Sequence, residues 1–140
     1  MDFSKMSPIQ RLDYMGFRRV GQWQTDSDKL KCAIQEHGSA SNILYAFVCD
    51  DAVLYIGKSV QTLKKRLYGY ERPGPTQYTN IKGNTYLKKL LSEGKSVHVH
   101  ALPDNGLLFY GGFHVNLAAG LEDALIAQLK PTWNGAGLAT

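Results

Sequence analysis

Two short apolar runs separated by a pair of aspartates form the clearest pattern along the chain. Residues 43–49 (ILYAFVC) are apolar throughout, and residues 53–56 (VLYI) follow the turn residues Asp50 and Asp51. Runs of strand-forming residues joined by turn chemistry are typical of a β-hairpin, and runs without polar alternation indicate strands buried on both faces. The pattern therefore predicts a buried hairpin that ends at Gly57.

Helical periodicity and helix-boundary residues mark four further segments. Helices are predicted at residues 4–16, 62–71, 84–93 and 115–129. Pro8 suits the first turn of the first helix, Asn84 can cap the third, and Gly94 follows the end of the third. Proline residues follow the second and fourth helices, which supports the boundaries given for them.

Two other segments have strand character. Residues 17–35 predict one or two strands, although their apolar positions are spaced irregularly, and residues 96–102 (SVHVHAL) alternate with a period of two. The order of elements predicts a mixed α/β (α+β) fold with a small, largely antiparallel sheet. A chain of 140 residues fits a single globular domain.

The net charge of +4 hides an uneven distribution of charge. Between Lys58 and Lys95 there are nine basic and two acidic residues, so this segment carries +7 while the rest of the chain carries −3. A concentrated positive segment favours a polyanionic partner. No apolar run reaches the ~18 residues that a membrane-spanning helix needs, and the N-terminus has no signal-peptide core. We therefore expect a cytoplasmic protein, in a bacterial or phage-infected cell, without a membrane partner.

The last predicted helix places a carboxylate in its apolar face. At about 100° per residue, Glu122 falls within the apolar arc that runs from Leu121 through Leu125 to Ile126, whereas Asp123 falls on the polar side. An ionised carboxylate in an apolar face costs several kcal/mol unless it is paired or bound to a cation. Two interpretations follow: a glutamate at the rim that meets a basic side chain, or a metal-binding carboxylate.

Arg66 is similarly out of place in the helix predicted at 62–71. It lies beside the apolar face that includes Tyr70, whereas Lys64 and Lys65 point away from that face. The two lysines predict a solvated basic surface. A guanidinium beside the apolar face suits a site that needs a fixed, forked donor to a phosphate.

The predicted hairpin carries two tyrosines, and their relative orientation depends on its turn. A two-residue turn places Tyr45 and Tyr55 on opposite faces of the sheet. A three-residue turn places Phe47 opposite Tyr55, so that both tyrosines face the same way. The sequence leaves both turns open.

These residues together resemble the GIY-YIG nuclease family. The matching pieces are Ile43-Leu44-Tyr45, then Leu54-Tyr55-Ile56-Gly57-Lys58-Ser59, then Arg66 in LKKRLYGY, and Glu122 in LEDALIAQLKPTWN, which ends at Asn134. The resemblance implies a small three-stranded antiparallel sheet flanked by helices. It places a nuclease domain at residues 42–140 and leaves residues 1–41 as an N-terminal helical and strand extension packed on that core.

The resemblance also implies the roles of five catalytic residues. Glu122 would hold one divalent cation, Mg²⁺ or Mn²⁺, and Arg66 would bind the scissile phosphate. Tyr45 would position or deprotonate the attacking water, with Lys58 as the cation that stabilises its phenolate. Tyr55 would complete the hydrogen-bonded pocket.

The same resemblance assigns further residues to substrate binding. Tyr70 would reach the phosphate one turn after Arg66, Gly57 would leave room for substrate, and Asn134 would close the site from the C-terminal loop. Lys82 would replace a His or Lys that many members carry near the start of the next helix. Basic residues between the hairpin and the third strand would line a DNA-binding surface, and they include Lys64, Lys65 and Arg72.

The function that follows is a metal-dependent endonuclease that hydrolyses phosphodiester bonds in double-stranded DNA. Two alternatives stay open: a non-catalytic nucleic-acid-binding module on the same fold, and a repair-type nuclease subunit. Restriction, degradation of host DNA by a phage and a toxin role all fit the chemistry. Cutting both strands requires two active sites or two successive events, so a homodimer or higher homo-oligomer is compatible with the sequence.

Overall fold

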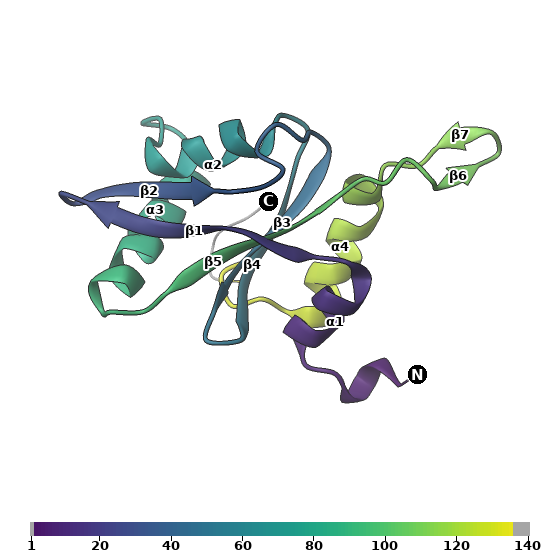
Figure 1. The fold of residues 1–140 in the computed structure, drawn as a ribbon, viewed down its shortest axis with the longest axis horizontal. Helices are drawn as coiled ribbons and strands as arrows, with labels where there is room; N and C mark the ends of the chain where they lie inside the picture. Colours follow the sequence, from purple (N-terminus) through teal and green to yellow (C-terminus); the bar gives the residue numbers. More distant parts are fainter. Residues whose placement is uncertain (1, 136–140) are drawn as a thin grey trace.

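A five-stranded antiparallel sheet organises the computed structural model, which describes residues 2–135 (Figure 1). The strands lie in the order β2-β1-β5-β3-β4 and are β1 (Arg18–Asp26), β2 (Lys29–Ile34), β3 (Ile43–Cys49), β4 (Ala52–Ser59) and β5 (Val97–Pro103). The helices are α1 (Pro8–Met15), α2 (Leu63–Glu71), α3 (Tyr78–Ser92) and α4 (Leu117–Leu129), preceded by the 3₁₀ turn η1 (Phe3–Lys5). A two-stranded hairpin, β6 (Phe109–Tyr110) and β7 (Phe113–His114), stands apart from the sheet.

The prediction of a three-stranded sheet is wrong, because the N-terminal segment adds two strands. β1 pairs antiparallel with β5 and, on its other side, with β2. A bulge between Arg19 and Gly21 shifts the register of β1. Val20 and Trp23 therefore both enter the same core although they are three residues apart. The bulge explains why the apolar spacing of this segment looked irregular in the sequence.

Helices cover both faces of the sheet. α2 and α3 supply Leu67 and Leu87 to one apolar core, which also contains Phe47 of β3. α1 and α4 supply Leu12 and Leu125 to a second core on the other face. β3 is buried along its whole length, which confirms the prediction of a strand with two apolar faces.

A bulge in the β3–β4 hairpin brings the two tyrosines of the predicted hairpin together. The turn has two residues, Asp50 and Asp51, both with positive φ, and Cys49 pairs with Ala52. The register then shifts by one residue, so that Phe47 pairs with Tyr55. The shift leaves Leu54 as the extra residue of β4. The tyrosines therefore share a face despite the short turn, and their ring centroids lie 6.2 Å apart.

α3 begins at Tyr78, six residues earlier than the predicted start of that helix at residue 84. Asn84 is not its cap but lies inside the helix, where its Nδ2 donates to the backbone oxygen of Tyr70 at 2.8 Å. Gly83 resembles a helix breaker in the sequence. In the structure it makes room for a tyrosine, because a Cβ at this position would lie 2.7 Å from Cδ1 of Tyr70.

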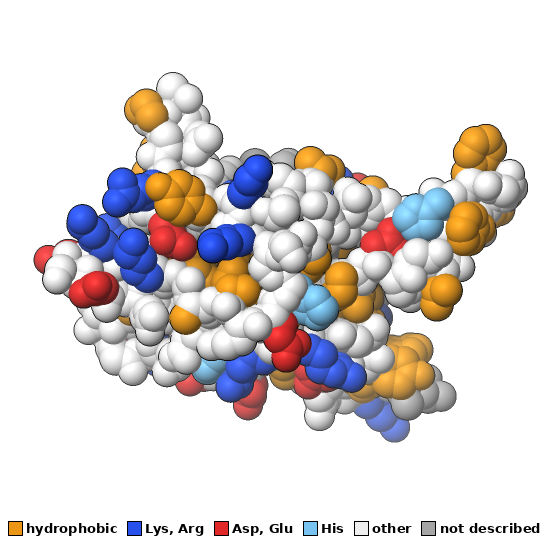
Figure 2. Space-filling view, turned by 45° about the horizontal axis from the view of Figure 1, so that its top comes forward, with side chains coloured by type: hydrophobic (Ala, Val, Ile, Leu, Met, Phe, Trp, Pro, Cys, Tyr) orange, Lys and Arg blue, Asp and Glu red, His pale blue; other side chains and the backbone are white. Residues whose placement is uncertain are grey.

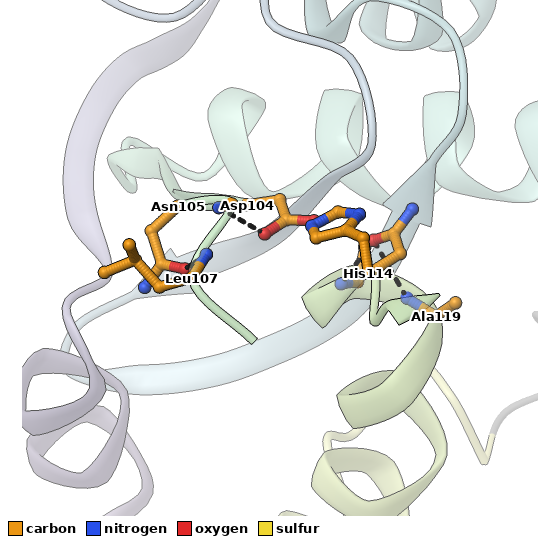
Figure 3. A network of polar contacts seen from close by, with 8 residues as sticks. Asp104, Asn105, Leu107, His114 and Ala119 are labelled. Carbon is orange, nitrogen blue, oxygen red and sulfur yellow. Dashed lines mark hydrogen bonds and ion pairs between the residues drawn. The ribbon is translucent and has the colours of Figure 1, made fainter. Parts of the chain in front are cut away.

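The β6–β7 hairpin projects from one end of the molecule and was not predicted from the sequence (Figure 1). Polar contacts close its base, where His114 Nε2 lies 3.0 Å from Asp104 Oδ2 and the backbone N–H of Leu107 donates to Asn105 Oδ1 (Figure 3). Its outer part is apolar and exposed, with Tyr110 84% and Phe113 79% accessible. The hairpin leads directly into α4, which carries Glu122.

No helix within residues 2–135 is long and apolar enough to cross a bilayer.

Candidate active site

A cleft of about 400 Å³ lies at β4, the edge strand of the sheet, where side chains from its two faces meet. The five residues predicted to be catalytic all line it, together with Thr79 and Asp123; they are Tyr45, Tyr55, Lys58, Arg66 and Glu122. The structure thus gathers residues from β3, β4, α2 and α4 in one place. Neither Thr79 nor Asp123 carried a sequence signal that singled it out.

Arg66 and two tyrosines form one hydrogen-bonded network in the wall of the cleft. Arg66 Nη2 donates to Tyr70 Oη at 2.8 Å, and the hydroxyls of Tyr70 and Tyr45 share a hydrogen bond of 2.9 Å. The guanidinium carbon of Arg66 lies 4.3 Å from the centre of the Tyr70 ring, within cation–π range. Tyr70 is fully buried, so it fixes Arg66 rather than extending into solvent.

The cleft tyrosines hold their protons tightly. Burial raises the pKa of Tyr45, and the positive charge of Arg66 only partly opposes this rise. Burial also raises the pKa of Tyr55 and Tyr70. These phenols are therefore neutral at neutral pH, so they can orient a water or a phosphate oxygen but cannot take up a proton in this state.

Gly57 is required by the packing of Tyr45. A Cβ at position 57 would lie 2.6 Å from both Cζ and Oη of Tyr45, and 3.0 Å from Cε2 of Tyr55. The predicted room at this glycine therefore exists, but Tyr45 itself occupies it.

Glu122 is 4% exposed on α4, which confirms that this residue belongs to the buried face of the helix. Its Oε1 lies 3.7 Å from Nζ of Lys58. Burial raises the pKa of the Glu122 carboxyl, and Lys58 opposes that rise. Lys58 was predicted to stabilise the phenolate of Tyr45, but here its ammonium pairs with the carboxylate, and Arg66 is the cation beside the phenols.

The carboxylates around Glu122 fit a cation that prefers oxygen ligands, such as Mg²⁺ or Mn²⁺, better than a metal that prefers His or Cys ligands. Within residues 2–135 no three His, Cys, Asp or Glu side chains gather as a metal-binding cluster. The donors present are the buried carboxylate of Glu122 and that of Asp123 beside it. Mg²⁺ is commonly held by one or two carboxylates, with waters and substrate phosphates as the other ligands.

Asn134 anchors the C-terminal loop to the edge of the sheet. Its Oδ1 accepts from the backbone N–H of Ile56 at 3.0 Å, and its Nδ2 donates to the backbone oxygen of the same residue at 3.0 Å. The adjacent Trp133 donates its backbone N–H to Leu54 at 2.7 Å. Asn134 therefore covers the open edge of β4 beside the cleft, and these contacts use its side chain for structure.

The basic residues predicted to bind substrate lie outside the cleft. Lys64, Lys65, Arg72 and Lys82 are all exposed. Lys64 lines a separate pocket beside β2, and Arg72 lines another together with Lys29. None of the four is among the residues that line the cleft.

Asn80 is a polar residue beside the site, in the region where the family resemblance implies a His or Lys. It lies near the start of α3, and its Oδ1 accepts a hydrogen bond of 2.8 Å from Nη1 of Arg66. Lys82, two residues further on, was the predicted residue in this region and is exposed on the helix surface. The sequence suggested Asn80 only as a possible DNA contact in a Gly- and Pro-rich loop, because its place beside Arg66 depends on the packing of α3.

Two solved structures are similar to this chain. A Glu-to-Ala mutant of bacteriophage T4 EndoII has a TM-score of 0.70 and 17% sequence identity, and the match covers 92% of this chain and 99% of that one. The restriction endonuclease Hpy188I, in complex with product DNA, has a TM-score of 0.53 and 17% identity over 97% of this chain and 82% of that one. No protein-family model and no curated protein sequence matches the chain.

At this level of identity the likeness shows a shared fold. The sequence resemblance to GIY-YIG nucleases, and to T-even phage endonuclease II among them, is therefore confirmed as a resemblance of fold.

Proposed function

We propose that this protein is a metal-dependent DNA endonuclease that hydrolyses phosphodiester bonds. The observation that carries the proposal is the cleft at β4, which combines a fixed guanidinium, two buried phenols, a lysine and a buried carboxylate. A polyanionic substrate needs cationic donors, and hydrolysis needs a held water and stabilisation of developing charge. The fold shared with two DNA endonucleases supports the same conclusion.

Arg66 binds the scissile phosphate in this proposal. Two of the five guanidinium N–H groups are used by Asn80 and Tyr70. The guanidinium also interacts with the Tyr45 hydroxyl. The donors that these residues leave open would bind a phosphate in the cleft, where their charge would stabilise the negative charge that develops in the transition state.

Tyr45 orients the attacking water as a neutral phenol, and Tyr55 contributes a second hydroxyl beside it. Their raised pKa values favour a positioning role over proton abstraction in the absence of another cation. Lys58 and Glu122 line the same cleft, with the Lys58 ammonium 3.7 Å from the Glu122 carboxylate. Glu122, with Asp123 beside it, would hold Mg²⁺ or Mn²⁺, which when bound polarises a phosphate oxygen and stabilises the leaving oxygen.

The positive segment supplies the surface for the rest of the DNA. Lys and Arg side chains gather on the part of the molecule that carries α2 and the β1–β2 hairpin (Figure 2). Contacts of this kind release counterions, so DNA affinity should fall steeply as salt concentration rises.

A plasmid assay tests the proposal. The protein is incubated with supercoiled plasmid and Mg²⁺ or Mn²⁺, with EDTA as the control, and a gel-shift measurement runs in parallel. Nicked or linear DNA with metal and none with EDTA is expected. Binding to the plasmid without nicking in either metal would contradict the proposal and support a non-catalytic binding module.

We further propose that the partner of the β6–β7 hairpin is a second copy of this chain. There is no Lys or Arg between residues 96 and 129, so the hairpin offers no countercharge to DNA. Its exposed side chains, Leu107, Leu108, Phe109, Tyr110 and Phe113, present roughly 500–700 Å² of apolar surface. Two copies would bury about 1,000–1,400 Å², which reaches the range of specific interfaces. The unpaired edges of a two-stranded ribbon are self-complementary about a twofold axis.

Sedimentation velocity tests this pairing. The wild type is expected to form dimers or larger homo-oligomers at micromolar concentration, and a variant with Phe109→Ser, Tyr110→Ser and Phe113→Ser is expected to be monomeric. Val60→Ser, at an exposed apolar position outside the hairpin, is the matched control and should behave as wild type. A monomeric wild type would refute the pairing.

A further inference from the structure

Asn80 is a buried polar residue in direct contact with Arg66, the residue proposed to bind the scissile phosphate. It is 9% exposed and lies in α3, whereas Arg66 belongs to α2. It lines a groove of about 430 Å³ that shares Arg66 and Thr79 with the cleft. A carboxamide that is removed from water must use its polar atoms in hydrogen bonds, and here both ends do so.

The hydrogen bonds of the preceding loop fix which way this carboxamide points. The backbone N–H of Gly74 can only donate, and it donates to Oε1 of Gln77 at 2.9 Å. The same oxygen accepts from Nδ2 of Asn80 at 3.0 Å. Oδ1 of Asn80 is therefore left to face Arg66, and it accepts from Nη1 at 2.8 Å. The backbone N–H of Gly74 thus sets the orientation of Gln77, and Gln77 sets that of the Asn80 carboxamide.

The close approach of α2 and α3 is adapted to this contact. Gly69 lies on α2 between Arg66 and Tyr70, and a Cβ there would lie 3.0 Å from Nδ2 of Asn80 and 3.4 Å from Nη1 of Arg66. An alanine at position 69 would press on both partners of the hydrogen bond. The absence of a side chain lets the carboxamide reach the guanidinium.

We propose that Asn80 is a positioning residue that fixes the guanidinium of Arg66 for the scissile phosphate. Asn80 holds one terminal nitrogen of the guanidinium and Tyr70 holds the other. With both nitrogens held, rotation of the guanidinium about its bonds is restricted, and its remaining donors keep one preferred direction. This role rests on the proposed endonuclease function, because it assumes that Arg66 contacts the reacting phosphate.

The first test observes the guanidinium itself and needs no activity. The ¹⁵N–¹H signals of the Arg66 Nη groups are recorded by NMR and assigned by their loss in Arg66→Lys. Asn80→Ala should make rotation of the guanidinium about tenfold faster, as expected for the loss of one hydrogen bond to a charged group. Gln77→Ala, a change at an exposed residue, should act in the same direction and more weakly. Wild-type rotation as fast as that of Asn80→Ala would refute the positioning role.

The second test is a double-mutant cycle in the plasmid-nicking assay. Asn80→Ala should lower kcat by about 10- to 100-fold, as expected for a misplaced catalytic group, with KM for DNA changed less than about threefold. In an Arg66→Ala background the same substitution should have little further effect, because its role passes through Arg66. Equal effects in both backgrounds would contradict positioning and indicate a purely structural role.

The two tests separate the two proposals. One outcome is that rotation is restricted in the wild type and faster in Asn80→Ala, while the protein nicks no DNA with either metal. That outcome would support the contact and refute the endonuclease function. Nicking that depends on Arg66 but not on Asn80 would support the function and refute the positioning role. Asn42→Asp, a substitution at an exposed position on a different segment, is the control and should leave both readouts unchanged.

Discussion

The ammonium of Lys58 lies 3.7 Å from the carboxylate of Glu122, and the two side chains differ sharply in exposure. The Lys58 side chain is 44% exposed, while that of Glu122 is 6% exposed. The pair therefore joins a solvated cation to a desolvated anion. Such a carboxylate lowers stability unless a cation compensates it, so this arrangement fits a site kept for function rather than for stability.

Glu122→Gln should make the protein more stable at neutral pH. Burial raises the pKa of Glu122 above its ordinary value of 4.5, so the folded state binds this proton more tightly than the unfolded state. The ionised Glu122 carboxylate therefore lowers the free energy of unfolding by its full amount only at pH values well above the folded pKa. This destabilisation disappears as the pH falls below 4.5. Thermal unfolding at pH 7 should show a higher Tm for the variant, with the gap closing towards pH 4. A lower Tm at pH 7 would show that the ion pair with Lys58 outweighs the cost of burial.

Gly57→Ala should destabilise the fold by about 1–3 kcal/mol through overpacking. The added methyl would lie 2.6 Å from the phenol of Tyr45, and a backbone-anchored Cβ cannot swing away. Urea unfolding measures the change. Gly120→Ala is the matched control, because a Cβ there meets only Val115 at 3.7 Å, and it should stabilise α4 by about 0.5–1 kcal/mol. Equal stability of Gly57→Ala and the wild type would show that Tyr45 can move without cost.

The stability of the protein should fall as the pH is lowered from 7 to 5. His100 is buried and neither of its ring nitrogens has a hydrogen-bond partner. Burial lowers its pKa below the ordinary 6.5, opposed by Asp13 and assisted by Arg19 and His98. The unfolded state therefore binds the proton first, and stability that is complete above pH 6.5 is lost as pH falls below that value.

His100→Leu tests which residue causes this loss. The free energy of unfolding, measured in urea between pH 5 and 7.5, should depend less steeply on pH in the variant than in the wild type. His37→Gln, at an exposed histidine, should keep the wild-type slope. An unchanged slope in His100→Leu would assign the pH dependence to other groups.

The parts of the fold that the sequence revealed are those set by local patterning. The unbroken apolar run of β3 and the position of Glu122 inside the apolar arc of α4 follow directly from side-chain periodicity, and both are buried as expected. Periodicity could not reveal the bulge at Leu54, which restores the common face of Tyr45 and Tyr55 after a two-residue turn. Bulges depend on strand pairing, which a single sequence does not encode locally.

The missing parts of the site depend on contacts between distant segments. The contact of Asn80 with Arg66 became visible only when α3 was found to start at Tyr78 and to pack on α2 at Gly69. The N-terminal strands belong to the sheet because β1 pairs with the edge of β5. No feature of residues 1–41 predicts this pairing. Five of the residues that line the cleft were predicted from the sequence, whereas the contacts that hold them, such as that of Asn80 with Arg66, were not.

The central claim is that Glu122 is required for cleavage of DNA. The measurement is the rate of nicking of supercoiled plasmid in Mg²⁺ by the wild type, by Glu122→Gln and by the control Glu93→Gln, which changes an exposed glutamate at the end of α3. We expect Glu122→Gln to lose at least about 100-fold in rate while it stays folded and binds plasmid, and Glu93→Gln to nick as the wild type does. Nicking by Glu122→Gln at the wild-type rate would contradict the account.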